Sequence, residues 1–401
     1  MQQLQLFLHY DRDKITQDLF RAYFDARKNK RNTINALAFE KYLESNLFAL
    51  ANEIIERNYT PKPSICFVVD KPVKREIFAA DFRDRVVHHL IYNYIYPIFD
   101  KIFINDSYSC RVGKGTHYGI KRVDHFIRSC SENYQKDCYI LKLDIQGYFM
   151  AMNRFLLYKK VRTVLEKNSS KLLVDFDILL YLIEKVIFNE PTKNCIFKGR
   201  KSNWYGLPAS KSLFYADVNC GLPIGNLTSQ LFGNIYMNEF DYWIKKELGI
   251  KYYGRYVDDF ILIHKNKHYL KSLIVKIKNH LKQELKLTLH PDKIYLQHYS
   301  KGVKYLGAVI KPFRIYISNR TKGNFFNAIE KQNQIIVNHK PSREEQRAFQ
   351  SSMNSYLGIM KHHKSFKLRK KLISKNLSAK WWNFVYLTGG IGKFVLRRKN
   401  Q

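Results

Sequence analysis

The chain has 401 residues, 45% hydrophobic and 15% aromatic, which is enough to bury a core in two or three subdomains. Its 69 Lys and Arg against 34 Asp and Glu give a formal net charge of +35, and the obvious partner of such a surplus is a polyanion. The longest apolar run, at 90–99, is too short for a membrane span, and the N-terminus lacks the cationic start of a secretory signal. We therefore expect a soluble, cytoplasmic protein without a membrane partner, whose six cysteines are reduced thiols.

The first 100 residues predict helices followed by strands and another helix. Residues 1–60 mix polar and apolar positions at a spacing of three to four, which favours helices. The stretch 60–78 is punctuated by prolines and rich in β-branched residues, which predicts strands. Helical periodicity returns at 81–103.

Strands and helices then alternate without a regular repeat. Strands are expected at 138–143, 252–263 and 303–310. Helices are expected between them, at about 153–190, 227–248 and 267–285. This order predicts an α+β sheet subdomain rather than a βαβ repeat. From Ser318 onward we expect only helices, and Ser342 with Glu345 three residues later has the form of a capping box.

The positive charge is concentrated near the C-terminus. No acid follows Glu345, and the last 56 residues carry thirteen Lys or Arg, six of them in "KHHKSFKLRKK" at 361–371. A basic, solvated face is one interpretation. The interleaving of Tyr and Phe with the bases favours a nucleic acid, because backbone neutralisation combined with stacking is how single strands are bound.

Two adjacent aspartates stand out in "KYYGRYVDDFILIHKN" at 251–266. The flanking residues predict two strands of a hairpin with Asp258 and Asp259 at or next to its turn. A solvated turn would explain the pair alone. However, Asp144 ends the predicted strand "YILKL", and an adjacent strand would bring it beside the pair. Hard divalent ions bind such oxygen ligands in phosphoryl transfer, so the three carboxylates predict nucleotidyl transfer.

These residues resemble the motifs of reverse transcriptases. "RYVDDF" has the form of their Tyr-x-Asp-Asp motif, and "LKLDIQGYF" looks like their first metal-binding motif. Five further blocks follow the order found in the family: "REIFAADFRDRVVHHLIY", "DSYSCRVGKGTH", "GLPIGNLTSQLFGNIYMNEFD", "LTLHPDK" and "VKYLGAVI". The resemblance covers about residues 60–310.

The resemblance implies a right-hand polymerase fold of the α+β class, with fingers, a palm of antiparallel sheet plus helices, and a helical thumb. Fingers are expected at 1–100, the first part of the palm at 101–152, and a helical segment of fingers or palm at 153–221. The second part of the palm is expected at 222–312 and a basic helical thumb at 313–401.

Within this family the chain is most similar to the reverse transcriptases of diversity-generating retroelements, in the group II intron and retron-like class. "GLPIGNLTSQ", "AADFRDRVVHH" and "NSYLGIMKHHKSFKLRKKL" carry that likeness. Ile224 stands where most reverse transcriptases have Gln, and in the resembled group an aliphatic residue there goes with error-prone copying of template adenines. Packing of a pocket wall is the alternative reading of Ile224.

The resemblance also implies roles for individual residues. Asp144, Asp258 and Asp259 would hold two Mg²⁺, with Mn²⁺ as a substitute. Phe149 matches the aromatic steric gate that favours deoxynucleotides over ribonucleotides. Lys293 resembles the residue that protonates the leaving pyrophosphate, and an exposed lysine without a role is the alternative.

Basic and primer-contacting residues are also expected from the motifs. Arg75, with Lys71 or Lys74, would hold the triphosphate, beside Ile224 and Gly225. The residues expected to contact template or primer are Arg111, Tyr256, Leu306, Gly307, Lys361, Lys364, Lys367, Arg369 and Lys370. The histidine pairs at 88 and 362 lack zinc-ligand spacing, so we expect surface or phosphate contacts there.

The implied partners are a template-repeat RNA, a DNA or cDNA primer, dNTPs and a small basic oligomeric accessory protein, in a bacterial or phage-infected cell. Two alternatives remain. One is a retron, antiphage-defence or group II intron-type reverse transcriptase of ordinary fidelity, although Ile224 and the short C-terminus speak against an intron enzyme. The other is a non-catalytic RNA-binding module.

Overall fold

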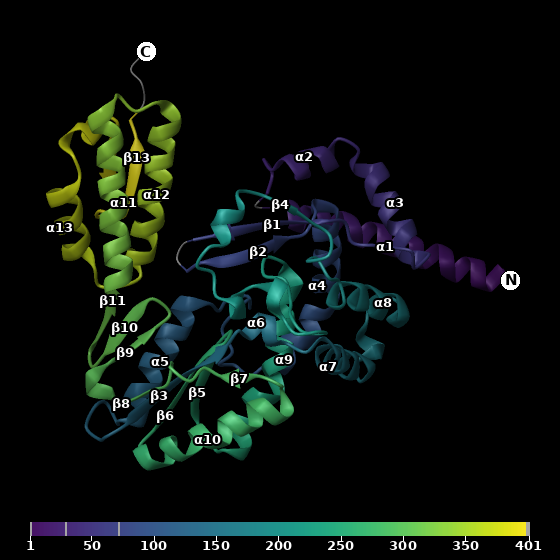
Figure 1. The fold of residues 1–401 in the computed structure, drawn as a ribbon, viewed down its shortest axis with the longest axis horizontal. Helices are drawn as coiled ribbons and strands as arrows, with labels where there is room; N and C mark the ends of the chain where they lie inside the picture. Colours follow the sequence, from purple (N-terminus) through teal and green to yellow (C-terminus); the bar gives the residue numbers. More distant parts are fainter. Residues whose placement is uncertain (1, 29, 71–72, 398–401) are drawn as a thin grey trace. The chain divides into compact units, whose positions relative to one another are not determined.

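The computed structural model describes residues 2–28, 30–70 and 73–397. The chain folds as two compact units (Figure 1). The first unit comprises Met1–Gly115, Lys142–Leu262 and His268–Ile294, and the second comprises Thr116–Leu141, Ile263–Lys267 and Tyr295–Gln401. Among the described residues, no helix has both the length and the apolar character needed to cross a bilayer.

The first unit begins with helices and a small sheet, as predicted for residues 1–103. The helices are α1 (Gln2–Arg27), α2 (Ile34–Glu40), α3 (Leu43–Ile55) and α4 (Phe82–Ile102). The sheet has the order β2-β1-β4, with β1 (Ser64–Val69) antiparallel to β2 (Arg75–Ala79) and parallel to β4 (Cys195–Phe197). Residues 195–197 therefore return to the sheet formed by the first strands.

A second sheet of this unit carries the predicted aspartates. Its order is β5-β6-β3-β7, made of β5 (Tyr252–Tyr256), β6 (Asp259–His264), β3 (Tyr139–Gln146) and β7 (Thr288–Leu289). The helices that follow or separate these strands are α6 (Tyr148–Ala151), α7 (Arg154–Glu166), α8 (Phe176–Ile187), α9 (Leu227–Tyr242) and α10 (Lys267–Glu284). A π-helical turn, Trp243–Glu247, extends α9. The predicted alternation of strands and helices is confirmed.

The second unit contains the helical C-terminal region. Its helices are α5 (Thr116–Cys130), α11 (Asn319–Asn338), α12 (Arg343–Lys361) and α13 (Phe366–Asn376). Its strands include β8 (Tyr295–His298) and an antiparallel sheet of order β11-β10-β9, formed by β9 (Val303–Tyr305), β10 (Ala308–Lys311) and β11 (Arg314–Ile317). The predicted capping box is confirmed, because Ser342 and Glu345 bond each other's backbone N–H.

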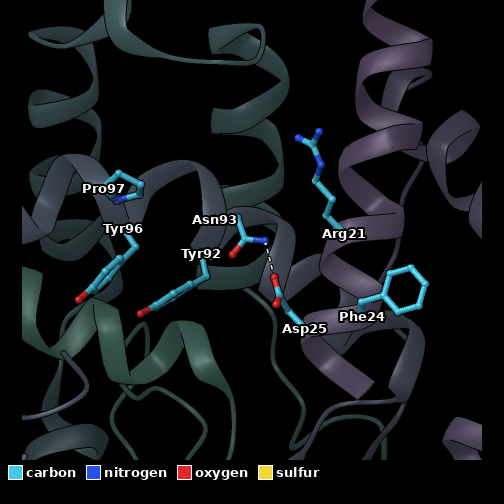
Figure 2. A pocket seen from close by; sticks show the side chains of 7 residues that line it. All are labelled: Arg21, Phe24, Asp25, Tyr92, Asn93, Tyr96 and Pro97. Atoms are coloured by element: carbon cyan, nitrogen blue, oxygen red, sulfur yellow. Dashed lines mark hydrogen bonds between the residues drawn. The ribbon is translucent and has the colours of Figure 1, made fainter. Parts of the chain in front are cut away.

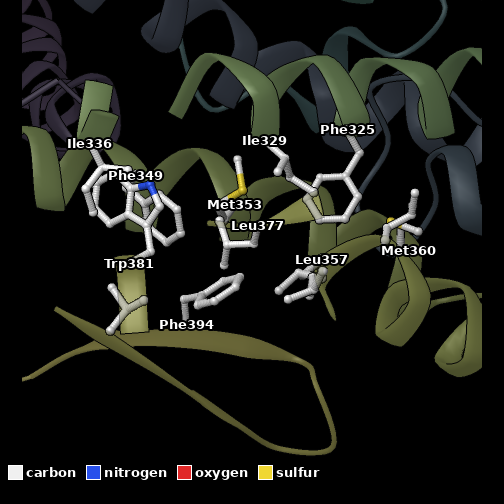
Figure 3. Packing of buried hydrophobic residues seen from close by; sticks show 13 residues of the cluster. Phe325, Ile329, Ile336, Phe349, Met353, Leu357, Met360, Leu377, Trp381 and Phe394 are labelled. Atoms are coloured by element: carbon white, nitrogen blue, oxygen red, sulfur yellow. The ribbon is translucent and has the colours of Figure 1, made fainter. Parts of the chain in front are cut away.

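The prediction that only helices follow Ser318 is wrong. Strands β12 (Val385–Thr388) and β13 (Lys393–Leu396) form an antiparallel hairpin. Its inward residues Val385 and Phe394 are fully buried and join the apolar cluster around Trp381, which packs between the helices (Figure 3). Gly389 and Gly390 have φ near +60° in the loop that joins the two strands, a conformation that glycine adopts without steric cost.

Candidate active site

The two adjacent aspartates lie at the turn of the β5–β6 hairpin, as predicted. Asp258 follows Val257 in the turn, and Asp259 is the first residue of β6. Val257 has φ +58°, a conformation that is costly for a β-branched residue and that requires support from its surroundings. The hairpin thus places two carboxylates on a turn with a strained backbone.

Asp144 lies beside this pair because β3 pairs with β6. The N–H of Ile145 donates a 3.2 Å hydrogen bond to the Asp258 carbonyl. The carbonyl of Asp144 itself accepts from the N–H of His290, at 2.9 Å. Backbone bonds therefore fix the third carboxylate next to the turn, and the predicted juxtaposition is confirmed.

Two lysines pair with these carboxylates. Lys142 lies 3.1 Å from Oδ2 of Asp259, and Lys293 lies 2.9 Å from Oδ1 of Asp144. Oδ1 of Asp259 is buried and accepts no hydrogen bond from any described residue. A buried carboxylate oxygen without a donor is energetically unfavourable, so this atom is suited to bind a cation.

Burial and mutual repulsion perturb the protonation of the hairpin aspartates. Burial, followed by the charge of Asp144, raises the pKa of Asp258 to about 6. Burial raises the pKa of Asp259 to about 7, although the Lys142 ammonium opposes the rise. The fold therefore holds these acidic groups together at a free-energy cost, which is common at functional sites, for example where carboxylates bind a cation.

A buried ion pair between β5 and α9 supports the hairpin. This pair was not identified from the sequence. Arg255 on β5 donates two hydrogen bonds, of 2.7 and 2.6 Å, to the carboxylate of Asp241 on α9, and neither side chain is exposed to solvent. Burial alone disfavours the charged guanidinium, but Asp241 more than offsets it and raises the pKa of Arg255. Arg255 also donates a 2.9 Å bond to the Val257 carbonyl, which ties the pair to the strained turn.

Gly254 allows the hairpin to approach the loop after α4. A Cβ at Gly254 would collide with the phenol of Tyr108. The next residue, Arg255, forms two backbone hydrogen bonds with this loop. Its carbonyl accepts from the Tyr108 N–H and its N–H donates to the Asp106 carbonyl, both at 2.9 Å. The hairpin is therefore fixed by both backbone and side-chain bonds.

The residues predicted to hold the nucleotide differ in their burial and in their contacts. Arg75 is exposed at the start of β2 and is close enough for its charge to lower the pKa of Asp258. Phe149 and Ile224 are half-buried and pack on the same apolar cluster, which includes Phe78. Lys74 instead donates to the Tyr205 carbonyl and lies 3.5 Å from Asp70. Lys71 lies outside the described residues.

Gly225 follows Ile224 at a close backbone approach. Its φ is +127°, and a Cβ there would lie 2.9 Å from Cγ2 of Ile77. The N–H of Phe78 donates a 2.9 Å bond to the Ile224 carbonyl. This strand contact fixes the backbone that carries Ile224.

The predicted template and primer residues have different environments. Arg111 donates to the Asp100 carboxylate at 2.6 Å and to the carbonyls of Asp100, Ile104 and Ser107. Its side chain is 5% exposed, so this guanidinium stabilises the fold and a template contact would break those bonds. Tyr256 is half-buried, and burial raises its pKa.

In the second unit, two of the residues predicted to contact template or primer lie in a strand turn. Leu306 and Gly307 connect β9 to β10 with φ values of +48° and +85°. The basic run at 361–371 exposes Lys361, Lys364, Lys367 and Lys370 to solvent. Arg369 differs from that prediction: it is 6% exposed and donates to the Ile391 carbonyl of the C-terminal hairpin.

His88 also differs from the predicted surface or phosphate contact. It is buried in α4, and its Nδ1 lies 2.6 Å from the Thr228 hydroxyl. Burial lowers its pKa to about 3, so the imidazole is neutral and structural. At the other predicted pair, the ring of His362 stacks on His117, with centroids 3.7 Å apart.

A surface pocket between α1 and α4 shares no residue with this site. The Tyr92 and Tyr96 rings lie side by side there, 4.7 Å apart, and Asn93 donates to Asp25 (Figure 2). The residues that line the pocket are Arg21, Phe24, Asp25, Tyr92, Asn93, Tyr96 and Pro97.

Within the described part of the chain, no group of three or more His, Cys, Asp or Glu is arranged to hold a metal ion. The donor set nevertheless fits a hard cation, because the three aspartates offer only oxygen ligands and no described residue donates a hydrogen bond to Oδ1 of Asp259. Ammonium groups already pair with two of the carboxylates. The site is thus built to face positive charge.

Comparisons with known proteins agree with the motifs. The model of the family described as reverse transcriptase (RNA-dependent DNA polymerase) matches residues 61–310. Protein YkfC of Escherichia coli strain K12 is 23% identical over 308 residues, which is 68% of this chain and 73% of YkfC.

Solved telomerase structures were also matched. A C-terminally truncated apo telomerase from Candida tropicalis has a TM-score of 0.45 at 14% identity, covering 67% of this chain and 59% of that one. Telomerase from Candida albicans in complex with a fragment of telomeric RNA has a TM-score of 0.46 at 9% identity, covering 82% and 64%. The chain thus spans about three fifths of the length of these telomerase chains.

Proposed function

This chain belongs to the reverse transcriptase (RNA-dependent DNA polymerase) family, and from that premise we propose that it copies an RNA template into DNA by nucleotidyl transfer. The observation that carries the proposal is the placement of Asp144 on β3 beside the Asp258–Asp259 turn, secured by the bond between Ile145 N–H and the Asp258 carbonyl. Carboxylates gathered on adjacent strands are the arrangement that metal-assisted phosphoryl transfer uses.

We propose that Asp144, Asp258 and Asp259 hold two divalent cations, Mg²⁺ or Mn²⁺. Bound there, the ions would neutralise the triphosphate and lower the pKa of the primer 3′ hydroxyl. Lys142 and Lys293 pair with two of these carboxylates, and an ion that takes the place of Lys293 on Asp144 would release that ammonium. Lys293 would then be free to donate a proton to the leaving pyrophosphate.

The nucleotide side of the site supports a preference for deoxynucleotides. Arg75 offers a forked donor to the triphosphate. Phe149 would fill the space of a ribose 2′ hydroxyl. Ile224 packs on the same apolar cluster as Phe149 and presents no group that can hydrogen-bond to the incoming base.

We further propose the diversity-generating type of reverse transcriptase, error-prone at template adenines. Ile224 supports this, because an aliphatic side chain cannot supply the hydrogen bonds that a Gln would give around the nucleotide. The fingers, palm and thumb would follow the boundaries expected from the sequence. A template-repeat RNA and a small basic accessory protein would be its partners, and the exposed lysines at 361–370 would contact the template–primer backbone.

The test is primer extension by the purified chain on an RNA template with Mg²⁺ and dNTPs, with Asp258→Asn as the matched control and cDNA errors scored by template base. We expect DNA synthesis by the wild type, none by the variant, and errors concentrated at adenines. A flat, low error rate would favour a retron or defence-type enzyme. Failure of synthesis, also with native RNA and the accessory protein, would refute the polymerase proposal.

A further inference from the structure

The segment from 193 to 216, here named the aromatic–basic segment, is exposed and lies outside the predicted site. It holds five Lys or Arg, five aromatic residues and no acid. Its bases are all exposed, namely Lys193, Lys198, Arg200, Lys201 and Lys211. Apart from Lys193, which pairs with Glu190, these bases form no ion pair with any described residue. They are therefore available to an anionic partner.

Large aromatic and apolar side chains lie between these bases. The exposed fraction is 88% for Tyr205, 74% for Tyr215 and 51% for Phe197. The ring of Phe197 stacks on Phe214 at 5.8 Å with an interplanar angle of 13° and meets Trp204 edge-on at 5.5 Å. Alternating cationic and aromatic groups bind single-stranded nucleic acid by neutralising phosphates and stacking on bases.

A buried acid fixes the segment in place. Glu76, which is 1% exposed on β2, accepts hydrogen bonds from the Trp204 indole at 2.7 Å, the Ser212 hydroxyl at 2.9 Å and the Leu213 N–H at 2.7 Å. The N–H of Lys198 donates a 2.8 Å bond to the Cys66 carbonyl on β1. The exposed rings are thus held by a rigid base, which lowers the entropy lost on binding.

The aromatic–basic segment packs against residues that are predicted to contact the nucleotide. Gly147, three residues after Asp144, has φ +56°, and a Cβ there would lie 2.9 Å from the Ser210 carbonyl oxygen. Trp204 and Leu213 pack in the same cluster as Phe149 and Ile224. A nucleic-acid strand bound to this segment would therefore pass close to Phe149 and Ile224, the residues proposed to contact the incoming nucleotide.

We propose that the aromatic–basic segment binds the single-stranded RNA template just ahead of the position being copied. The inference rests on the proposed function for the identity of the strand. A protein partner fits less well, because the cores of protein interfaces are depleted in lysine, whereas four of the five bases here are lysines.

The test measures the affinity of the full chain for primer–template duplexes without dNTPs, by fluorescence anisotropy. One duplex is blunt and the other carries an RNA template overhang of about 12 nucleotides, within the range of single-strand site sizes. The ratio of the two affinities reports the overhang alone. We expect a ratio of about tenfold or more for the wild type.

Two variants separate stacking from charge. Replacing Phe197, Tyr205 and Tyr215 with Leu keeps apolar bulk but removes the stacking rings, and should abolish most of the ratio while leaving the blunt-duplex affinity unchanged. Replacing Lys198, Arg200, Lys201 and Lys211 with Gln should also reduce the salt slope of overhang binding by about 3, at roughly 0.7 per lost phosphate contact.

The matched control removes four exposed lysines from α10, namely Lys271, Lys276, Lys278 and Lys282. It lowers the net charge equally and should leave the ratio unchanged. A wild-type ratio near one, or a ratio equal in all variants, would overturn the proposal. If the ratio behaves as expected but primer extension fails, the polymerase proposal falls and the RNA-binding surface stands.

Discussion

The Asp241–Arg255 pair provides a sharp test of how the catalytic turn is held. We consider Asp241→Asn, which keeps the size of the side chain and one carbonyl oxygen but removes its charge. Both partners are fully buried and joined by two charge-assisted bonds. Removing one partner from a buried pair leaves the other charge uncompensated and costs about 3–5 kcal/mol. Because Asn can still accept one bond, we expect the lower end, about 3 kcal/mol.

Urea unfolding of the purified variant, followed by circular dichroism, measures this cost as a shift in midpoint at constant slope. A second variant, Asp241→Leu combined with Arg255→Met, removes both charges and replaces them with apolar groups. Its stability should return to within about 1–2 kcal/mol of the wild type. A loss below about 1 kcal/mol for Asp241→Asn, or a double variant as unstable as the single one, would refute the reasoning.

The double variant also separates stability from positioning. Arg255 donates to the Val257 carbonyl, and no methionine can replace that bond. The strained turn should relax, and misplacement of a reacting group by about 1 Å can cost on the order of 100-fold in rate. We therefore expect a folded protein with primer-extension activity reduced about 10- to 100-fold, at an unchanged Km for dNTP. Full activity would assign the pair to stability alone.

Three further outcomes follow from the site. Because the pKa values of Asp258 and Asp259 are raised from 3.8 to about 6 and about 7, these two groups bind more protons in the folded metal-free protein than in the unfolded chain, so the stability they contribute should be lost as pH rises from about 4 to 7. Thermal unfolding in EDTA should show the wild type losing stability over this range relative to the variant in which both aspartates are replaced with Asn, and a difference that does not change with pH would contradict it. Ile224→Gln should lower misincorporation opposite adenine about tenfold in sequenced cDNA, and an unchanged error spectrum would count against its assigned role. Phe149→Ala should increase ribonucleotide incorporation on the order of 10- to 100-fold in competition assays, and unchanged selectivity would make Phe149 an ordinary apolar contact.

Local pattern and strand order explain why the aspartate site could be predicted. Asp144, Asp258 and Asp259 each follow or begin a segment whose apolar and β-branched residues specify a strand. Pairing of β3 with β6 then brings the carboxylates together without further information. The capping box at Ser342 was equally local, since both of its partners lie within one turn of helix.

Features that depend on tertiary contacts could not be read in the same way. Asp241 and Arg255 lie on a helix and a strand separated by a loop, and nothing in either element marks them as partners. Arg369 was read as part of a basic run, yet it lies on the buried face of α13 with Leu372 and Ile373. That spacing of three and four was a visible helical signal. The Gly389–Gly390 pair likewise signals a hairpin turn, although the surrounding helices suggested otherwise.

The site combines groups that destabilise the fold with groups that compensate for them. Val257 holds a left-handed backbone, and Asp259 buries an oxygen that accepts no hydrogen bond from the described part of the chain; both are costly in the absence of a ligand. Next to this turn, the fully buried side chains of Arg255 and Asp241 form an ion pair, and Arg255 also donates a hydrogen bond to the Val257 carbonyl. An apolar pair there could match their stability but could not donate to that carbonyl. The buried ion pair is therefore explained by the need to position the strained turn, because stability alone would be served as well by a hydrophobic core.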